Sequence, residues 1–311
     1  MTPSPLHQHS AAGWRFATLA LVVVLISGCT RASKVPDWSK DLPLTQRSRY
    51  FTIHYQRSAW DAAELARFAD GFVELVDRDF LPARFDRPMD VLVFPDRASF
   101  HRYLRKVLGA DLTPMGIYLP ALSVFATSED SGLGTFAHEI MHPIARRALR
   151  DAPQWADEGI PAFFEKFTGY WENGHLVAQW GYQNPWRLEV IGGALTQLDL
   201  EQVAAKERAT SQLDLAADRL LAVFLWRQGR LERFLRLVAA GDRAGFGTYL
   251  EAALERPLAE VVPLWRAYLE DIAANRAAAM RVPPSTVYPD RASYERAMAS
   301  DRPWLQARQL P

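Results

Sequence analysis

The chain has 311 residues, of which 49% are hydrophobic and 12% aromatic, enough for a packed core in one large or two modest domains. Its 36 basic side chains, Lys plus Arg, are matched by 36 acidic ones. This balance gives no support to a polyanion or a strongly charged substrate as a ligand, and we expect no nucleic-acid partner.

The amino terminus has the pattern of a lipoprotein signal peptide. Trp14-Arg15 precedes an apolar run at residues 16–26, which is too short to cross a bilayer as a stable helix. The run ends in Ser27-Gly28-Cys29, whose small residues suit a cleavage site and resemble a bacterial lipobox. We therefore expect residues 1–28 to be the lipoprotein signal peptide. An ordinary export signal that contains a cysteine, or a buried apolar helix, is the alternative.

Cys29 is the only cysteine, so an intramolecular disulfide is excluded even in an oxidising compartment. Use of Cys29 as a lipidation site explains its presence there. Thr30 follows it, which by resemblance to lipoprotein sorting favours the outer membrane. We expect an exported protein, anchored to the cell envelope by an N-terminal lipid and facing the periplasm, with residues 29–46 as a polar tether.

Strand and helix patterns alternate in the next part of the chain. Runs of β-branched and aromatic residues predict strands at residues 50–55, 90–94, 116–119 and 122–126. Apolar stripes at helical spacing predict helices over residues 59–79 and 97–108. This alternation predicts an α+β fold or an α/β subdomain, with a small mixed sheet, within residues 47–168.

Two histidines on the following helix have the spacing of metal ligands. His138 and His142 are four residues apart, so they lie one turn from each other on the same helix face and can hold one metal ion. An apolar stripe places this helix, from about residue 135, against a core; its members are Phe136, Ile140 and Ile144. A structural histidine pair beside an ordinary glutamate is the alternative interpretation.

A second helix supplies a carboxylate. In the segment Pro153-Gln154-Trp155-Ala156-Asp157-Glu158-Gly159, a proline at a first helical position predicts a helix with Glu158 in its first turn. His138, His142 and Glu158 would then form a His2Glu zinc site with a fourth position for water. Glu139 points off the ligand face and can act as the general base that takes a proton from that water.

These two motifs resemble a known family. The run Gly134-Thr135-Phe136-Ala137-His138-Glu139-Ile140-Met141-His142-Pro143, followed by Pro153-x-Trp155-x-x-Glu158-Gly159-x-x-Ala162, resembles gluzincin-type zinc metallopeptidases, in particular the secreted peptidase-MA-like group. The resemblance extends over about residues 49–272, but only the two motifs are specific. It implies a zincin-like fold, a Zn²⁺ cofactor and a peptide or protein substrate, with Glu139 as general base and Glu158 as third ligand.

The chain departs from the family pattern at three places. Pro143 and Pro161 would each remove a helical hydrogen bond, so we expect kinks or helix ends there. Ala162 stands where thermolysin-like members have an aspartate, four residues after the third ligand. The partner of a zinc-bound histidine must then come from elsewhere, and Asp157 or Glu165 are the candidates.

A strand beside the metal helix pairs with the peptide substrate in related zinc peptidases, and an open sheet edge allows such pairing. Residues 123–126 are the candidate for this strand. A fully paired core strand is the equally supported alternative.

The aromatic segment at residues 170–187 suggests a long loop or hairpin near the cleft. A zinc peptidase needs a donor for the oxyanion of its tetrahedral intermediate. His175 and Tyr182 are the candidates, against a packing role for each.

Residues 169–279 are expected to contain this loop and a helical subdomain. The apolar spacing predicts helices over residues 213–228, 231–240, 246–254 and 258–274. Residues 280–311 are polar and uneven, and we expect a C-terminal tail that is disordered or lies on the surface.

The sequence thus predicts a zinc-dependent metallopeptidase that hydrolyses peptide bonds in the bacterial cell envelope. The alternative is a catalytically inactive, metal-stabilised binding or assembly module of the envelope. It is favoured by the unusual prolines, the missing aspartate and the unassigned oxyanion donor. A structural envelope component without a metal is a third, weaker hypothesis.

Overall fold

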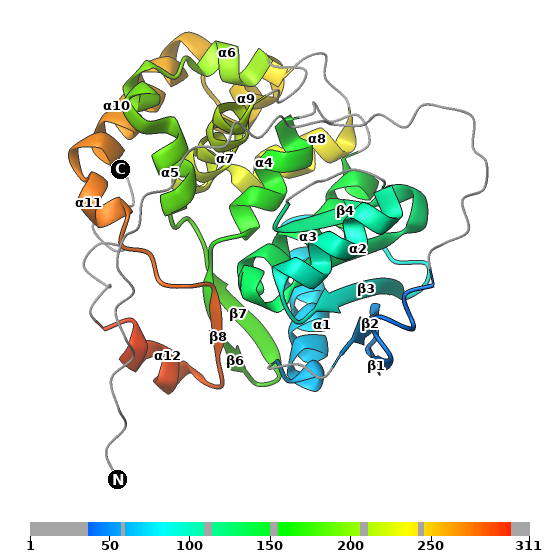
Figure 1. The fold of residues 1–311 in the computed structure, drawn as a ribbon. Coiled ribbons are helices and arrows are strands. Elements are labelled where there is room, and N and C mark those ends of the chain that lie inside the picture. The colour runs from blue at the N-terminus through cyan, green and yellow to red at the C-terminus, as the bar shows by residue number, and fades with distance from the viewer. Residues whose placement is uncertain are drawn as a thin grey trace, which may run out of the picture.

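The computed structural model describes residues 37–56, 60–108, 114–149, 155–205, 211–241 and 246–299. Helices surround two small sheets, which confirms the α+β prediction (Figure 1). The signal peptide, Cys29 and residues 29–36 of the predicted tether lie outside the described residues. Among the described residues, no helix has both the length and the apolar composition needed to cross a lipid bilayer.

The first sheet has five strands in the order β1-β2-β3-β5-β4. They are β1 (Leu44–Arg47), β2 (Phe51–Tyr55), β3 (Met89–Phe94), β4 (Gly116–Leu119) and β5 (Val124–Ser128). The three central strands are parallel, and β1 and β4 pair antiparallel at the two edges. A sheet with a parallel centre must be covered on both faces, which explains why β3 is buried along most of its length.

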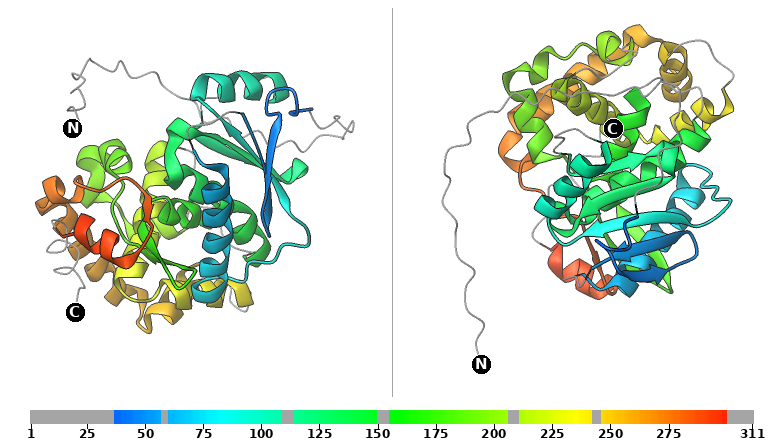
Figure 2. Two further views of the ribbon diagram at one scale, coloured as in Figure 1. Left: turned by 90° about the horizontal axis from the view of Figure 1, so that it is seen from below. Right: turned by 45° about the vertical axis from the view of Figure 1, so that its right-hand side comes forward.

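Helices cover both faces of this sheet, and alternate strand residues pack against each (Figure 2). On one face, α1 (Ala62–Asp79) and α3 (Gly132–Ala148) share a core with Val91, Val93 and Phe125. On the other face, α2 (Arg97–Leu108) packs against the neighbouring strand residues, including Leu92. The period-2 alternation of the strands therefore decides which residues can reach α3.

The strand predictions need one correction. Residues 124–126 fall in β5, which pairs with β3 on one side and β4 on the other, so they cannot offer an open edge, and Ser123 lies in the turn before the strand. The alternative of a fully paired strand is confirmed. Among the described strands, β4 forms the edge of the sheet on this side.

The predicted tether also needs a correction. Leu42 is 1% exposed within the core beneath α2, and β1 pairs with β2 from Leu44 onward. The part of the tether from residue 37 is therefore folded. The sequence pattern here is mostly polar because only one leucine is buried and because an edge strand needs an apolar side chain on only one of its faces.

The helix α3 is followed by α4 (Trp155–Phe164), and both contain a proline. The prediction of a helix end at Pro143 or Pro161 is wrong, because each helix continues through its proline. Proline lacks the amide that would bond to the carbonyl four residues earlier. The carbonyls affected belong to Glu139 and Asp157, so the helical ladder is interrupted twice beside the metal motif.

A second sheet follows α4, with strand order β7-β6-β8. The strands β6 (Thr168–Glu172) and β7 (His175–Gln179) form a hairpin, as one of the two predicted forms of the aromatic segment. The strand β8 (Thr286–Tyr288) pairs parallel with β6. The helix α12 (Arg291–Ala297) and the buried Met298 follow it. Residues 280–299 of the predicted tail are therefore folded, and their strand and helix lie near the surface, which was one of the two forms expected for the tail.

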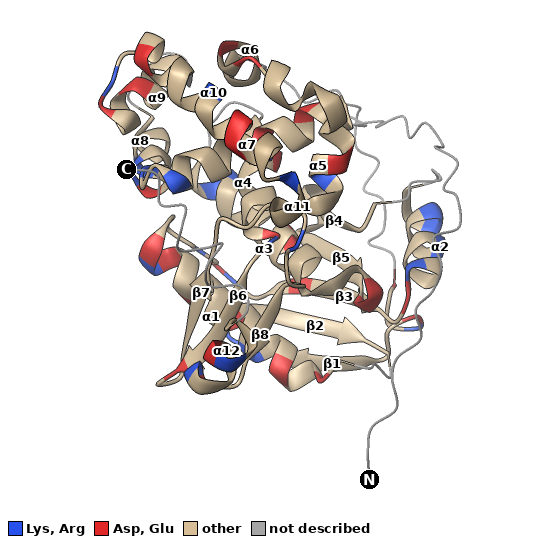
Figure 3. Cartoon of the chain, turned by 90° about the vertical axis from the view of Figure 1, so that its left-hand side faces the viewer, with Lys and Arg blue, Asp and Glu red and all other residues tan. Residues whose placement is uncertain are grey.

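The rest of the chain is helical, as predicted. It comprises α5 (Pro185–Ile191), α6 (Leu200–Ala205), α7 (Gln212–Arg227), α8 (Leu231–Ala240), α9 (Phe246–Leu254), α10 (Leu258–Ala274) and α11 (Arg276–Ala279). Short 3₁₀ turns lie at Pro120–Leu122, Glu129–Ser131 and Gly192–Gln197. One hydrophobic core joins these helices to the first sheet. Acidic and basic positions are interspersed along them (Figure 3).

Candidate metal centre

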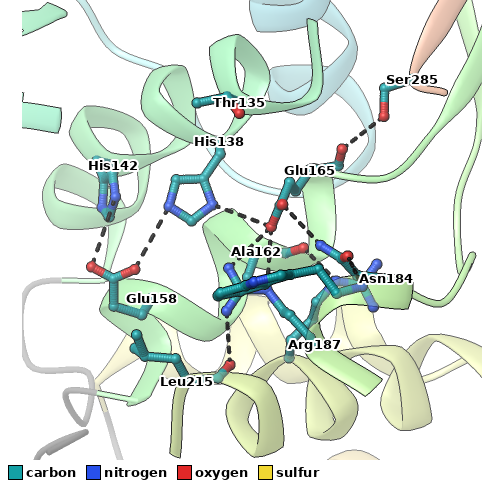
Figure 4. A network of polar contacts seen from close by, with 12 residues as sticks. Thr135, His138, His142, Glu158, Ala162, Glu165, Asn184, Arg187, Leu215 and Ser285 are labelled. Carbon is teal, nitrogen blue, oxygen red and sulfur yellow. Dashed lines mark hydrogen bonds and ion pairs between the residues drawn. The ribbon is translucent and has the colours of Figure 1, made fainter. Parts of the chain in front are cut away.

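The two histidines of the motif lie side by side on α3. The ring centroids of His138 and His142 are 4.9 Å apart, and the two residues are only 9% and 7% exposed. The opposite side of the helix carries Phe136, Ile140 and Ile144, each at most 1% exposed. Burial of this stripe fixes the rotation of the helix, which turns both imidazoles toward α4 (Figure 4).

These side chains form a group that could hold a metal ion. One ligand atom from each of His138, Glu139 and His142 lies within 4.8 Å of the other two. Imidazole nitrogens and carboxylate oxygens are the ligands that zinc and related divalent metals take in proteins. The described residues thus contain a buried His-Glu-His group that could hold a metal ion, with Glu139 in place of the predicted third ligand Glu158.

Glu158 faces both imidazoles from the first turn of α4. Its Oε2 is 3.6 Å from Nε2 of His138, and its Oε1 is 4.0 Å from Nε2 of His142. Ligand atoms around a tetrahedral zinc are about 3.3 Å apart, given zinc–ligand distances of about 2.0–2.2 Å. Movements below an ångström would bring each of these two pairs of atoms to that separation. The Glu158 side chain is 40% exposed, so this side of the centre is open to solvent.

Glu139 differs from Glu158 in its surroundings. It is 4% exposed, and burial raises its pKa to about 8, with a further contribution from the negative charges of Glu158 and Glu165. Its Oε2 is buried and has no hydrogen-bond partner among the described residues. A buried carboxyl group in this state suits a proton carrier better than a permanent anion.

A second carboxylate stands behind each imidazole, on the side away from Glu158. Oε2 of Glu165 is 4.0 Å from Nδ1 of His138, and Oδ1 of Asp157 is 4.0 Å from Nδ1 of His142. Both Nδ1 atoms are buried without a hydrogen-bond partner among the described residues. The structure therefore brings both candidate partners to the centre, one for each ring. A carboxylate behind a ligand histidine fixes the ring and its tautomer.

Arginines hold both of these carboxylates. The Arg187 guanidinium donates to Oε2 of Glu165 from Nε at 3.3 Å and Nη2 at 3.0 Å, and Asn184 Nδ2 donates to Oε1 at 2.8 Å. Arg146 donates to the two oxygens of Asp157 at 2.9 and 2.7 Å. Both histidines are thus backed by an arginine–carboxylate pair (Figure 4 shows Glu165, Asn184 and Arg187).

Arg187 and Asn184 were not predicted from the sequence, and they lie at the start of α5, after the hairpin of β6 and β7. The position of Glu165 did carry a signal, because it lies seven residues after Glu158, about two helical turns, just beyond the end of α4. The charge of Arg187 is the largest influence that lowers the pKa of Glu165 to about 2, against the effect of burial.

The two imidazoles differ in protonation. Burial lowers the pKa of His142 to about 4, so this ring is neutral at pH 7. Burial also acts against a charge on His138, but Glu158, Glu139 and Glu165 around it outweigh that effect and raise its pKa. A bound divalent cation would replace the proton on His138 as the positive charge that neutralises these carboxylates. The donor set, the unpartnered Glu139 oxygen and the excess of carboxylates all fit such an ion.

Neither predicted oxyanion donor is placed at this centre. His175 is exposed at the start of β7, where it pairs with Glu172 next to the hairpin turn. Tyr182 is 2% exposed, and its hydroxyl lies 2.7 Å from Oγ1 of Thr168 and 3.9 Å from Sδ of Met298. Both assignments are therefore corrected: the aromatic segment packs as a hairpin against the core.

We expect Glu139 to destabilise the metal-free protein at alkaline pH. Its pKa is raised from the ordinary 4.5 to about 8, so the folded state keeps a proton that the unfolded state loses between these values. Stability is then lost as the pH rises through that interval. In urea unfolding of the metal-free protein, Glu139→Gln should be more stable than wild type at pH 8, by about 1.4 kcal/mol per pKa unit, and the difference should shrink toward pH 5. A pH-independent difference would contradict this assignment.

No family model and no curated protein matches the chain.

Proposed function

We propose that the protein is a zinc-dependent metallopeptidase, a hydrolase of the gluzincin type, that cleaves peptide bonds in the bacterial cell envelope. The observation that carries the proposal is the position of Glu158, whose two oxygens face the Nε2 atoms of His138 and His142 at 3.6 and 4.0 Å. A carboxylate from a second helix completes a three-ligand set and leaves the solvent side open, as hydrolytic zinc sites require.

The residues around the site have separate roles in this proposal. His138, His142 and Glu158 would hold the metal, and Glu165 and Asp157 would orient the two rings. When bound, zinc supplies Lewis-acid chemistry that acidifies water and polarises a peptide carbonyl. Glu139 would take the proton from the attacking water and return it to the leaving amine. Its buried position beside both histidines supports this role, and the charge of a bound cation would counter the raised pKa of the metal-free state and favour the ionised form that a base needs.

The edge strand β4 is the surface on which we place the peptide substrate. It pairs with β5 on one side, and no described strand pairs with its other side. An extended peptide can bind there through backbone hydrogen bonds. Tyr118 of β4 lies over His142, with the two rings nearly parallel at 10° and their centroids 6.2 Å apart, so the strand borders the metal centre.

The location in the envelope is a separate proposal that rests on Cys29. Cleavage before this residue and its acylation would anchor the protein to the outer membrane by a lipid. Mass spectrometry of the mature protein should find a lipid-modified Cys29 as the first residue. An unmodified or differently cleaved amino terminus would contradict the anchor, without bearing on catalysis.

Hydrolysis is tested by incubation of the zinc-loaded protein with a mixed peptide library and analysis of the products by mass spectrometry. We expect cuts that a chelator abolishes and added zinc restores. His142→Ala should bind less than stoichiometric zinc and make no cuts. Full zinc occupancy in His142→Ala would contradict the ligand assignment.

The second candidate function is a metal-stabilised binding or assembly module. It is favoured by the positions of His175 and Tyr182, which leave no candidate oxyanion donor from the aromatic segment at the centre. Both functions require stoichiometric metal, so metal content does not separate them. Full occupancy without any cut in the peptide library would favour the binding module.

A further inference from the structure

Gly116, the first residue of β4, lies directly against the carboxyl group of Glu139. A Cβ atom at this position would be 2.6 Å from Oε1, 2.7 Å from Cγ and 2.9 Å from Cδ of Glu139. Non-bonded heavy atoms of this kind prefer separations of about 3.5–4.0 Å. Any side chain at position 116 would thus overlap with the glutamate.

The backbone conformation at position 116 does not require a glycine. Gly116 is absent from the glycines with positive φ, which are Gly132, Gly174, Gly181, Gly192, Gly229 and Gly241. Its conformation is open to any residue, so the requirement at this position is one of space.

The same face of β4 carries a large side chain two residues further on. Side chains at positions 116 and 118 point to the same side of β4, and Tyr118 is stacked over His142. Ile117 points to the opposite side and packs against the core beneath α2. The missing side chain is therefore confined to the place where Glu139 meets the strand.

Two hydrogen bonds hold the chain just before Gly116, so the strand cannot easily move away from α3. His101 Nε2 donates to the Pro114 carbonyl at 3.0 Å, and Thr127 Oγ1 donates to the Met115 carbonyl at 3.1 Å. The first bond joins the segment to α2 and the second joins it to β5. A larger residue at position 116 would accordingly displace the Glu139 carboxyl group instead of the strand.

We infer that Gly116 is a positioning residue for Glu139, because its lack of a side chain lets the carboxyl group rest against the edge strand. The inference rests on the proposed function for its catalytic consequence. The contact itself is a structural claim that holds with or without catalysis. A peptide that pairs with β4 would pass the carboxyl group at this point, where a proton must be transferred.

The contact is tested by a double-mutant cycle in urea unfolding of the metal-free protein. Gly116→Ala should lower the unfolding midpoint when Glu139 is present. The same substitution in Glu139→Ala should have a much smaller effect, because the overlapping atoms are gone. Gly193→Ala is the matched control, since nothing lies within 4 Å of a Cβ there and its φ is not positive.

Each outcome of the cycle decides the claim. If Gly116→Ala fails to fold but Gly116→Ala/Glu139→Ala folds, the rescue supports the contact. Equal shifts of the midpoint in both backgrounds would overturn it.

The catalytic consequence is measured on the zinc-loaded protein. Gly116→Ala should lower kcat by about 100-fold, as expected for a displacement near 1 Å, with KM and zinc content close to wild type. A wild-type kcat in Gly116→Ala would overturn the positioning role. If wild type itself shows no turnover, the proposed function fails while the unfolding cycle still decides the contact.

Discussion

Replacement of Glu139 by glutamine is expected to lower kcat by about 10²–10⁴-fold while bound zinc stays near one equivalent per chain. The amide is nearly the same size as the carboxyl group, so it keeps the contact with Gly116 but cannot accept the proton from water. Because Glu139 is not in the proposed ligand set, the metal should be unaffected. The measurements are peptide hydrolysis and zinc content of the same preparation.

The outcome separates three roles for Glu139. Loss of turnover with full zinc supports the general base. Loss of both would make Glu139 a ligand, as its place within 4.8 Å of the histidine nitrogens also allows. Retained turnover would reject its catalytic role. Glu201→Gln is a suitable control, because Glu201 is exposed on α6.

Replacement of Glu165 by glutamine should weaken zinc binding and also destabilise the fold. The carboxylate behind a ligand histidine typically contributes about 10–100-fold to metal affinity. Glu165 is also the charge partner of Arg187, whose side chain is only 10% exposed. Removal of one member of a buried ion pair costs about 3–5 kcal/mol, because the other charge stays behind without compensation.

Asp157→Asn provides a matched comparison. Asp157 stands behind His142 as Glu165 stands behind His138, but its arginine partner, Arg146, is 45% exposed. Solvent-exposed pairs contribute about 0–1 kcal/mol, so this variant should lose zinc affinity with little loss of stability. Zinc titration and urea unfolding of both variants check the prediction. Equal losses of stability in the two variants would contradict the difference in burial.

The grouping of His138, Glu139 and His142 could be predicted from local spacing, because all three residues lie on one helix. His138 and His142 share a face because of the helical repeat, and the apolar stripe at Phe136 and Ile140 decides which face is buried. Glu158 needed one further step, the return of the chain after α3. In the structure its two carboxyl oxygens lie 3.6 and 4.0 Å from the Nε2 atoms of His138 and His142.

Strand order was beyond the reach of the sequence, because it depends on contacts between distant residues. The segments at 116–119 and 122–126 have similar composition, and only their pairing shows that β4 is the edge and β5 is internal. For the same reason β8 was not predicted, because it has only three residues and is recognised by its pairing with β6. Gly116 also carried no signal, since its role depends on a helix that approaches it from later in the chain.

The expectation of a helix end at the two prolines gave more weight to intrinsic helix propensity than to packing. Pro143 and Pro161 each cost a hydrogen bond, but both are buried. Burial of the surrounding apolar residues offsets that cost, as tertiary context often does. Glu165 was one of two candidates named from the sequence, whereas Arg187 in α5 and Asn184 just before it required the fold.

The central claim is a divalent metal held by two imidazoles and one carboxylate. X-ray absorption at the zinc edge, on the protein reconstituted with zinc and on Glu158→Ala, tests it most directly. The predicted result is one zinc per chain with two imidazole ligands and oxygen ligands in wild type, and loss of the carboxylate in Glu158→Ala. Absence of stoichiometric zinc, fewer than two imidazoles, or an unchanged spectrum in Glu158→Ala would contradict the account.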